Sequence, residues 1–394
     1  MELIRYRDQS DIKIRILQQV FRRGALSRIE LAEELRVSSA TITKFVRSLL
    51  QEGVIVEGEL IASGIGRKPI NLNPNPHAGA VLAIDIGAWY VRVAVVDFSC
   101  TLLDSARFLS EEITPETLLS HLQPWLSQLV KRKGIGIAVG VSGLVDRETG
   151  SVLFCPNIPR WNGICIRSLL EEASGLPVLV EPSARFMAHA ESRIGAGIGV
   201  QDQLTVSIGY GIGAGLVFNG RLYSGQGGHA GELGHVQVEE NGTRCTCGNY
   251  GCLENYVTYP LILEHIQERM RRYQGYSPLK LLQPDPDKVT ETDLQTALQQ
   301  GDRLVTDEME STGKRIGVAL ANMANMLNPG RIILNGGVVA LFPELVDIAA
   351  RTVRERCLTP VRKDLTLVRS ELGWKSALLG GALSMLDVFV QRES

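Results

Sequence analysis

A short proline- and asparagine-rich segment, residues 71–76, divides the chain into two parts of different character. Two prolines and three asparagines within this segment are typical of a linker. Residues 1–75 carry 12 Lys/Arg and 9 Asp/Glu, a net charge of +3, whereas the other residues carry 29 and 34, a net charge of −5. The apolar run 80–85 after the linker predicts a buried strand. We therefore expect a domain boundary near residue 75.

The first part shows the pattern of three short helices. Apolar residues recur at helical spacing over residues 12–21, and Gly24 ends that pattern. Ser27 and Glu30 have the spacing of a capping box that opens a second helix, and Ser38 can cap a third. The apolar stripe of the third helix is Ile42, Phe45, Val46 and Leu49. Two short helices joined by a tight turn predict a helix-turn-helix.

The outward face of the third predicted helix is suited to DNA. No acidic residue lies between Glu34 and Glu52, and this face carries small hydroxyls and cations, which fit phosphates and base edges in a major groove. We expect strands at 54–57, 60–62 and 70–72, a turn at Gly58, and a basic wing tip that enters a minor groove. The candidate DNA-binding residues are Ser39, Thr43, Lys44, Arg47, Arg67 and Lys68. The alternative is a protein-contact module with solvated charges.

Three clustered cysteines indicate a metal site in the second part. Cys245, Cys247 and Cys252 lie within eight residues of one another, and His235 precedes them. Three thiolates and an imidazole are a common structural Zn²⁺ ligand set, and four protein ligands leave no open coordination position. We therefore expect one structural zinc per chain. His229 is a competing ligand, and three buried thiols without a metal are the alternative.

These residues, in this order, resemble the ROK family of repressors and sugar kinases over nearly the whole chain. Gly231–Glu232–Leu233–Gly234–His235 followed by the cysteine segment and Glu254 resembles the family signature. The resemblance implies an α/β fold: an N-terminal winged helix-turn-helix, then a two-lobed actin-like, hexokinase-type (ribonuclease-H-like) ATPase domain. Strand-like apolar runs at 82–86, 91–96, 135–141, 178–180, 204–208 and 332–334 agree with it. We expect domains at 1–75, 76–190 (completed by a C-terminal helix at about 375–394) and 191–374.

The parts that a kinase of this family needs are altered in this chain. The ATP phosphate loop corresponds to residues 85–90, where Ala88 and Trp89 replace glycine and threonine. The Asn-Asp pair, whose Asp is the general base, corresponds to Pro182 and Ser183, and the sequence reveals no base that would activate a serine hydroxyl. The second phosphate turn corresponds to 209–215, with Tyr210 for threonine. We interpret the domain as a non-catalytic ligand sensor.

The resemblance also implies the positions that face a sugar. The candidate ligand-binding residues are Asn157, Ser183, Glu232, His235 and Glu254. Carboxylates and an imidazole bind vicinal hydroxyls well, and His235 has one nitrogen for zinc and one for the sugar. For Glu232 and Glu254 the alternative is a role in holding the zinc loop. Because the Asn-Asp pair is lost, the expected effector is an unusual sugar or a sugar phosphate, or none at all.

The composition excludes several classes of protein. A hydrophobic share of 44% and a net charge of −2 argue against a disordered chain and a wholly basic nucleic-acid coat. No run reaches the ~18 apolar residues of a membrane span, and residues 1–10 lack the core of a signal peptide. We expect a cytoplasmic, sugar-responsive repressor, a homodimer or homotetramer, that binds double-stranded operator DNA. The alternatives are a ROK-type kinase of a hexose or N-acetylhexosamine, and an adaptor for a partner protein.

Overall fold

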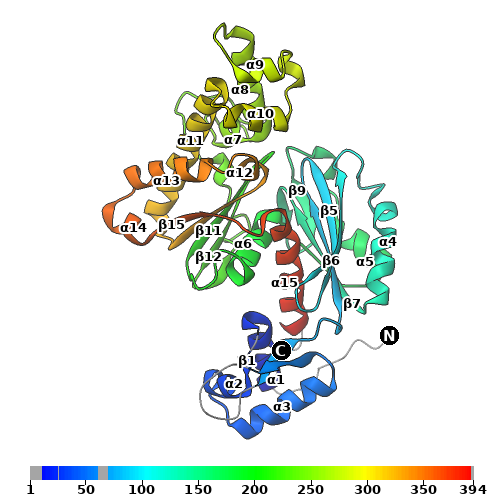
Figure 1. Cartoon of the computed structure of the whole chain (residues 1–394). Helices are drawn as coiled ribbons and strands as arrows, with labels where there is room; N and C mark the ends of the chain where they lie inside the picture. The colour runs from blue at the N-terminus through cyan, green and yellow to red at the C-terminus, as the bar shows by residue number, and fades with distance from the viewer. Residues whose placement is uncertain (1–10, 25, 61–69, 392–394) are drawn as a thin grey trace.

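The computed structural model describes residues 11–24, 26–60 and 70–391 (Figure 1). These residues form a small N-terminal unit of three helices and an antiparallel sheet, followed by two larger α/β lobes. The elements of the N-terminal unit are α1 (Asp11–Arg23), β1 (Leu26–Ser27), α2 (Arg28–Leu35), α3 (Ser39–Gln51), β2 (Ile55–Leu60) and β3 (Ile70–Pro74). The predicted helix-turn-helix is confirmed as α2 and α3, and β2 pairs with β3 as the strands of a wing.

Local hydrogen bonds explain why α2 and α3 begin and end where they do. The Ser27 hydroxyl accepts a bond from the Glu30 N–H at 3.3 Å, and the Ser27 N–H donates to the Glu30 carboxylate at 2.8 Å. This is the predicted capping box, which satisfies two of the free donors at a helix start. Arg36 then adopts the left-handed conformation (φ 53°), and Ser38 caps α3. The turn between the two helices is therefore tight.

The predicted turn at Gly58 is wrong. β2 continues through Gly58 to Leu60, with an irregular register against β3 between Glu57 and Leu60. A Cβ atom at Gly58 would lie 2.3 Å from the Asn73 side chain amide nitrogen. The glycine therefore permits close approach of two strands and does not reverse the chain.

The first lobe contains a five-stranded sheet in the order β10-β7-β4-β5-β6, in which β4, β7 and β10 are parallel. β4 and β7 are buried along their whole length, which explains their continuous apolar sequence. Helices α4 and α5 cover one face of this sheet. The elements are β4 (Ala80–Ile86), β5 (Tyr90–Asp97), β6 (Leu102–Leu109), α4 (Leu118–Lys131), β7 (Gly134–Val141), β8 (Leu144–Asp146), β9 (Ser151–Phe154), η1 (Pro159–Trp161), α5 (Ile166–Ser174) and β10 (Val178–Pro182).

The second lobe contains a five-stranded sheet in the order β13-β12-β11-β14-β15 and most of the remaining helices. Its strands are β11 (Gln203–Ile208), β12 (Ile212–Phe218), β13 (Arg221–Tyr223), β14 (Arg331–Asn335) and β15 (Thr366–Arg369). Its helices are η2 (Leu233–His235), α7 (Glu254–Val257), α8 (Tyr259–Arg272), α9 (Pro278–Leu282), η3 (Pro286–Lys288), α10 (Glu291–Gln299), α11 (Arg303–Leu327), α12 (Gly337–Leu341), α13 (Leu345–Arg356), α14 (Thr359–Asp364) and η4 (Gly373–Lys375). Helices α8, α9 and α10 lie at the top of Figure 1.

Two helices lie between the lobes (Figure 1). Helix α6 (Ser183–Ile194) packs on β11 and β12, and α15 (Ser376–Gln391) packs on α6 and on β4 and β7. Helix α1 of the N-terminal unit contacts α15. One buried apolar cluster therefore runs from the N-terminal unit into the first lobe.

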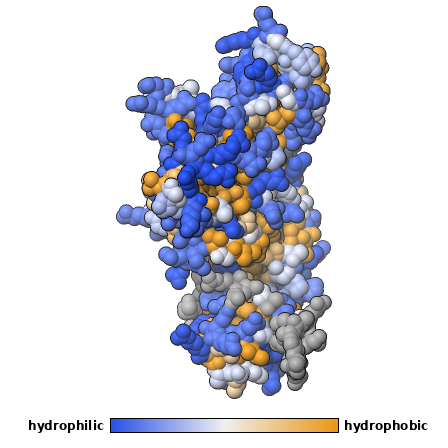
Figure 2. Space-filling view, turned by 60° about the vertical axis from the view of Figure 1, so that its left-hand side comes forward, coloured by the Kyte–Doolittle hydropathy of each residue, from blue (hydrophilic) through white to orange (hydrophobic). Residues whose placement is uncertain are grey.

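In the part of the chain that the structure describes, no helix combines the length and apolar character needed to cross a membrane. In the view of Figure 2, the upper part of the molecule is mostly hydrophilic, whereas hydrophobic residues gather on its middle part. Contiguous apolar surface of this kind is typical of a contact area.

Candidate functional site

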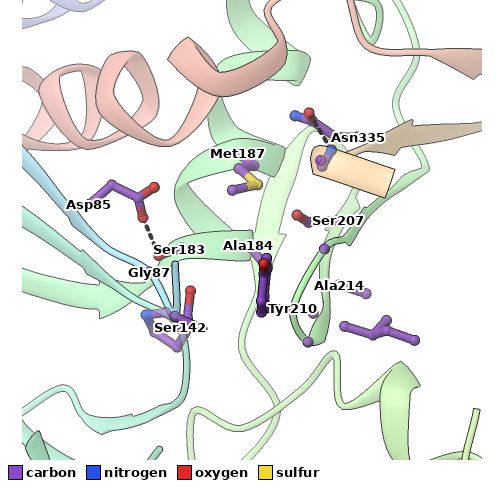
Figure 3. Close-up of a pocket in the computed structure, with 18 of the residues that line it drawn as sticks. Asp85, Gly87, Ser142, Ser183, Ala184, Met187, Ser207, Tyr210, Ala214 and Asn335 are labelled. Atoms are coloured by element: carbon purple, nitrogen blue, oxygen red, sulfur yellow. Dashed lines mark hydrogen bonds between the residues drawn. The ribbon is translucent and has the colours of Figure 1, made fainter. Parts of the chain in front are cut away.

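A cavity of about 550 Å³ lies between the two lobes (Figure 3). Residues at the end of β4 and at the start of α6 line one side, and the turn between β11 and β12 lines the other. Open α/β sheets bind ligands outside the carboxyl ends of their strands, which is where this cavity lies. We treat it as the candidate ligand site.

Ser183 and Asp85 form a hydrogen-bonded pair on the floor of the cavity (Figure 3). The Ser183 hydroxyl donates to the Asp85 carboxylate at 2.6 Å, and both side chains are buried. Burial raises the pKa of Asp85, against the opposing effects of Arg92 and the serine hydroxyl. The expectation that Ser183 has no basic partner is therefore wrong.

Strand register explains the contact that the sequence concealed. Asp85 on β4 and Glu181 on β10 both pair with Gly140 on β7 between them. A Cβ atom at Gly140 would lie 3.0 Å from the Ser183 hydroxyl oxygen and 3.3 Å from the Asp85 carboxylate. Because Gly140 has no side chain, the Ser183 and Asp85 side chains, which come from either side of β7, can meet over it.

Trp89 and Tyr210, the two aromatic residues that the sequence comparison with a kinase singled out, contact each other across the cavity. The rings of Trp89, from the first lobe, and Tyr210, from the second, stack with centroids 4.8 Å apart and planes 17° apart. Tyr259 lies beside Tyr210 with ring centroids 5.8 Å apart. The stack therefore joins a loop of the first lobe to a turn of the second within the cavity.

Two predicted ligand residues hold the turn that carries Tyr210. The Asn157 side chain amide donates to the Tyr210 carbonyl at 3.2 Å, and the Glu254 carboxylate accepts from the Ile212 N–H at 3.0 Å. Gly211 lies between them, because a Cβ atom there would be 3.0 Å from the Asn157 amide nitrogen and 3.3 Å from the Glu254 carboxylate. Both residues line the cavity, and one polar atom of each side chain is hydrogen-bonded to this turn.

An ion network around the buried Glu181, which sequence reasoning missed, joins the two lobes beside the cavity. Glu181 accepts from Arg147 at 2.6 Å and from Arg185 at 2.8 Å. Arg185 also donates to the Tyr223 carbonyl, and Arg147 donates to the Ser224 hydroxyl, both in the second lobe. The i, i+4 spacing of Glu181 and Arg185 was the available signal. The network links β10 and α6 to the last residue of β13 and to the residue after it.

The predicted metal ligands come together at the edge of the same cavity. One ligand atom from each of His235, Cys245, Cys247 and Cys252 lies within 4.8 Å of the others. The Cys247 and Cys252 sulfur atoms are 3.7 Å apart, and His235 Nδ1 is 3.7 Å from the Cys245 sulfur. A tetrahedron with ~2.3 Å metal–sulfur bonds spaces its sulfur atoms ~3.8 Å apart. The four side chains therefore fit a tetrahedral metal ion.

His235 faces both the cysteines and the cavity. Its Nε2 atom lies 3.9 Å from the Glu232 carboxylate, on the side opposite the nitrogen near Cys245. Glu232, His235 and His229 all line the cavity, whereas His229 is outside the metal cluster. A metal held by His235 would thus also orient the ring toward a ligand.

The predicted DNA-facing residues of α3 lie on one exposed surface. Ser39, Thr43, Lys44 and Arg47 are exposed, while Ile42, Val46 and Leu49 are buried. The Thr43 hydroxyl donates to the Ser39 carbonyl at 2.7 Å, which leaves its oxygen able to accept a further hydrogen bond. Arg67 and Lys68, predicted at the wing tip, lie outside the described residues.

Both parts of the chain match the sequence models of known protein families. Residues 81–387 match the sequence model of the ROK family, and residues 9–56 match a winged helix-turn-helix DNA-binding model. The DNA-binding transcriptional dual regulator NagC of Escherichia coli (strain K12) is 30% identical over 91% of this chain and 88% of that protein. The xylose repressor of Bacillus subtilis (strain 168) is 28% identical over 95% and 94%.

Solved structures with the same architecture include a regulator and a kinase. A ROK family transcriptional regulator, described as a homolog of the E. coli MLC protein, has a TM-score of 0.80 and 28% identity, covering 97% of both chains. A ROK family glucokinase from Streptomyces griseus, in complex with glucose and AMPPNP, has a TM-score of 0.70 and 27% identity. It covers 77% of this chain and 98% of its own. Of these two structures, only the regulator covers enough of this chain to include the N-terminal unit.

Proposed function

Because this chain belongs to the ROK family, we propose that it is a sequence-specific DNA-binding transcriptional repressor whose kinase-like domain senses a sugar or sugar derivative without catalysis. The observation that carries this proposal is the Trp89–Tyr210 stack between the former phosphate loops, in a chain that also has a winged helix-turn-helix. Relatives that match across both parts of the chain are named as regulators and repressors. A repressor works in the compartment that holds its DNA, which supports a cytoplasmic protein.

The proposed DNA contacts are those of α3 and the wing. Ser39, Thr43, Lys44 and Arg47 enter the major groove, and Arg67 and Lys68 the minor groove; the exposure of the first four supports their part. A homodimer or homotetramer would present two such units to half-sites about one helical turn, or a multiple of it, apart. The apolar surface in Figure 2 supports a contact between subunits.

The proposed effector is a sugar or sugar phosphate bound in the cavity. Asn157, Ser183, Glu232, His235 and Glu254 supply hydroxyl, amide, imidazole and carboxylate groups, the chemistry that recognises vicinal hydroxyls. An effector that binds one lobe arrangement better than another shifts the population toward it. The lobe angle then sets how the dimer presents its two winged units.

We propose the same domain division as the sequence predicts: residues 1–75, residues 76–190 together with the C-terminal helix, and residues 191–374. The two separate five-stranded sheets support this division.

The proposed cofactor is one structural zinc ion per chain, held by His235, Cys245, Cys247 and Cys252. Their mutual distances and their donor atoms support zinc. With four protein ligands, the ion would supply a fixed cross-link and no site for activating water. Because His235 is only three residues from Glu232, this cross-link would also fix the position of Glu232 beside the cavity.

DNA binding is tested with α3 variants against an operator selected from random DNA. Lys44→Ala and Arg47→Ala should weaken binding without changing the fold, since both side chains are exposed. Losing a phosphate contact should reduce the salt slope by about one, whereas losing a base contact should cost about 1–3 kcal/mol at one position. Lys131→Ala, an exposed cation on α4, is the matched control and should bind as the parent does. Parent-like binding by both α3 variants would overturn the proposal.

Sensing and catalysis are separated by two assays. A thermal-shift screen against glucose, N-acetylglucosamine, xylose and their phosphate esters should reveal a ligand that raises the melting temperature. A coupled ADP-release assay over the same sugars should give no turnover, because general-base assistance worth ~10²–10⁴ is altered and Trp89 occupies phosphate space. Ser183→Asp alone should not restore turnover for the same reason. Robust turnover by the unmodified chain would promote the sugar-kinase alternative.

A further inference from the structure

The N-terminal unit docks on a small junction at the far end of the two interlobe helices. We define the junction as Phe21 of α1, Phe98 of the β5–β6 turn, Phe389 and Asp387 of α15, and Arg193 of α6. The Phe21 and Phe98 ring centroids are 4.9 Å apart, and those of Phe98 and Phe389 are 5.6 Å apart. The junction therefore combines a first-lobe turn with the ends of both interlobe helices.

Helix α6 connects this junction with both lobes. Its first residue, Ser183, bonds to Asp85 of the first lobe at the cavity floor. Further along, Ala184 and Ala188 lie against Gly215 of β12, where a Cβ atom would be 2.5 Å from the Ala184 carbonyl oxygen and from the Ala188 methyl. Glu191 accepts a hydrogen bond from Ser370, which follows β15. One side of α6 thus packs on the second lobe, while its other side packs on α15.

Arg193, in the last turn of α6, is shared among three elements. Its guanidinium donates to Asp387 at 3.1 Å and to the Phe21 carbonyl at 3.1 Å, and it lies 3.3 Å from His189 Nε2. Phe21 lies in the last turn of α1, where carbonyls lack partners within the helix and a cation is favourable. The buried Arg193 Nε has no hydrogen-bond partner among the described residues. The position is therefore held by specific contacts and yet leaves one donor unsatisfied.

Helix α1 is bonded and packed directly against α3. The buried Lys13 ammonium of α1 bonds to the Ser48 hydroxyl at 3.1 Å and to the Glu52 carboxylate, at the carboxyl end of α3. Ile16 and Val20 of α1 are fully buried in the same cluster as the apolar stripe of α3. Helices α1 and α3 therefore form one packed body, so a change at the junction would carry to α3.

We propose that Arg193 is the positioning residue through which the lobe arrangement reaches the DNA-binding unit. One side of α6 packs on the second-lobe sheet and its other side on α15, which packs on the first-lobe sheet together with Phe98. A rotation between the lobes that shifts α6 along α15 therefore changes the distance between Phe98 and Arg193. The Arg193–Phe21 hydrogen bond forms in one arrangement and breaks in another, which changes the orientation of α3. This inference deepens the proposed function and rests on it, because it names the route of the regulation.

The tether is tested by hydrogen exchange on the full-length chain, without DNA or sugar. Arg193→Gln should raise amide exchange across residues 14–24 about tenfold, the change that loss of one charge-assisted hydrogen bond produces. Arg331→Gln is the matched control, because Arg331 also donates to a backbone carbonyl, that of Ala196, away from the N-terminal unit. The control should leave residues 14–24 unchanged. Equal exchange there in Arg193→Gln and the parent would overturn the proposal.

The coupling is tested by a double-mutant cycle with the cavity. Trp89→Ala removes the interlobe stack and should alter exchange across residues 14–24 in the parent background. The same change in the Arg193→Gln background should have no further effect. A route through Arg193 would be refuted by either of two results. Trp89→Ala would leave exchange across residues 14–24 unchanged in the parent background, or it would still change that exchange in the Arg193→Gln background. Because neither assay uses DNA or sugar, failure here is distinct from failure of operator binding or sugar sensing.

Discussion

Removal of the metal is expected to unfold one loop and to leave both sheets intact. The loop 236–252 has little apolar burial of its own: within it, Cys245 and Cys252 are the buried hydrophobic residues. Ordering the backbone costs ~1–2 kcal/mol per residue, so a loop of this length costs on the order of 20 kcal/mol to fix. Backbone hydrogen bonds such as Val238 N–H to the Gly251 carbonyl (2.8 Å) return ~1 kcal/mol each.

On this reasoning a bound metal would supply the largest stabilising contribution to the loop. Structural zinc contributes ~10–16 kcal/mol of apparent folding free energy in zinc-finger peptides. The second-lobe sheet has a separate, extensive apolar cluster that includes β11, β14 and α11. Loss of the metal should therefore raise exchange across 236–252 to rates near those of unstructured chain, with β11 and β14 still protected.

The perturbations are a strong chelator and the substitution Cys247→Ser. Elemental analysis should find close to one zinc per parent chain and far less in the variant, and the variant should melt at a lower temperature. Cys165→Ser is the matched control: this half-buried thiol bonds to the Thr149 carbonyl and Ser168, away from the cluster, so it should keep its zinc. Metal-free protein with parent-like melting and parent-like exchange in the loop would refute the reasoning.

Two further predictions concern pH dependence and helix packing. Because burial raises the pKa of Asp85 above 3.8, the unfolded chain loses that proton first as pH rises, and stability falls until the folded pKa is passed. Asp85→Asn should therefore be more stable than the parent in urea unfolding at pH 7, with a difference that shrinks as pH falls toward 4; a constant difference would contradict the assignment. A Cβ atom at Gly380 would lie 1.8 Å from the Phe186 carbonyl oxygen of α6, so Gly380→Ala should cost at least ~1–3 kcal/mol and lower the calorimetric melting temperature. Gly337→Ala, where a Cβ atom meets nothing within 4 Å, should melt like the parent.

Local signals in the sequence predicted the elements of this fold well. The capping box at Ser27 and Glu30 and the cap at Ser38 involve residues three positions apart, so their geometry is fixed by the chain itself. The predicted strand runs correspond to β4, β5, β7, β10, β11 and β14, because strands buried on both faces are continuously apolar.

Contacts set by tertiary register could not be predicted in the same way. The Ser183–Asp85 pair depends on β4 and β10 flanking β7 at a glycine, and residues 98 positions apart carry no mutual signal in one sequence. Trp89 and Tyr210 were each recognised as departures from a kinase, yet their stacking needs the closing of two lobes. The prediction of a turn at Gly58 failed because glycine occurs both in turns and where two strands approach closely.

The Trp89–Tyr210 stack also gives the protein an optical signal of its own. The chain has four tryptophans, of which Trp161 is fully buried and Trp125 nearly so. Trp89 is 46% exposed and depends on a ring from the opposite lobe for its stacking partner, so its emission wavelength and quenching should follow the separation of the lobes. With Trp374, which also lines the cavity, replaced by phenylalanine, the remaining variable fluorescence would belong to Trp89. Opening and closing would then be readable in real time in the unlabelled chain.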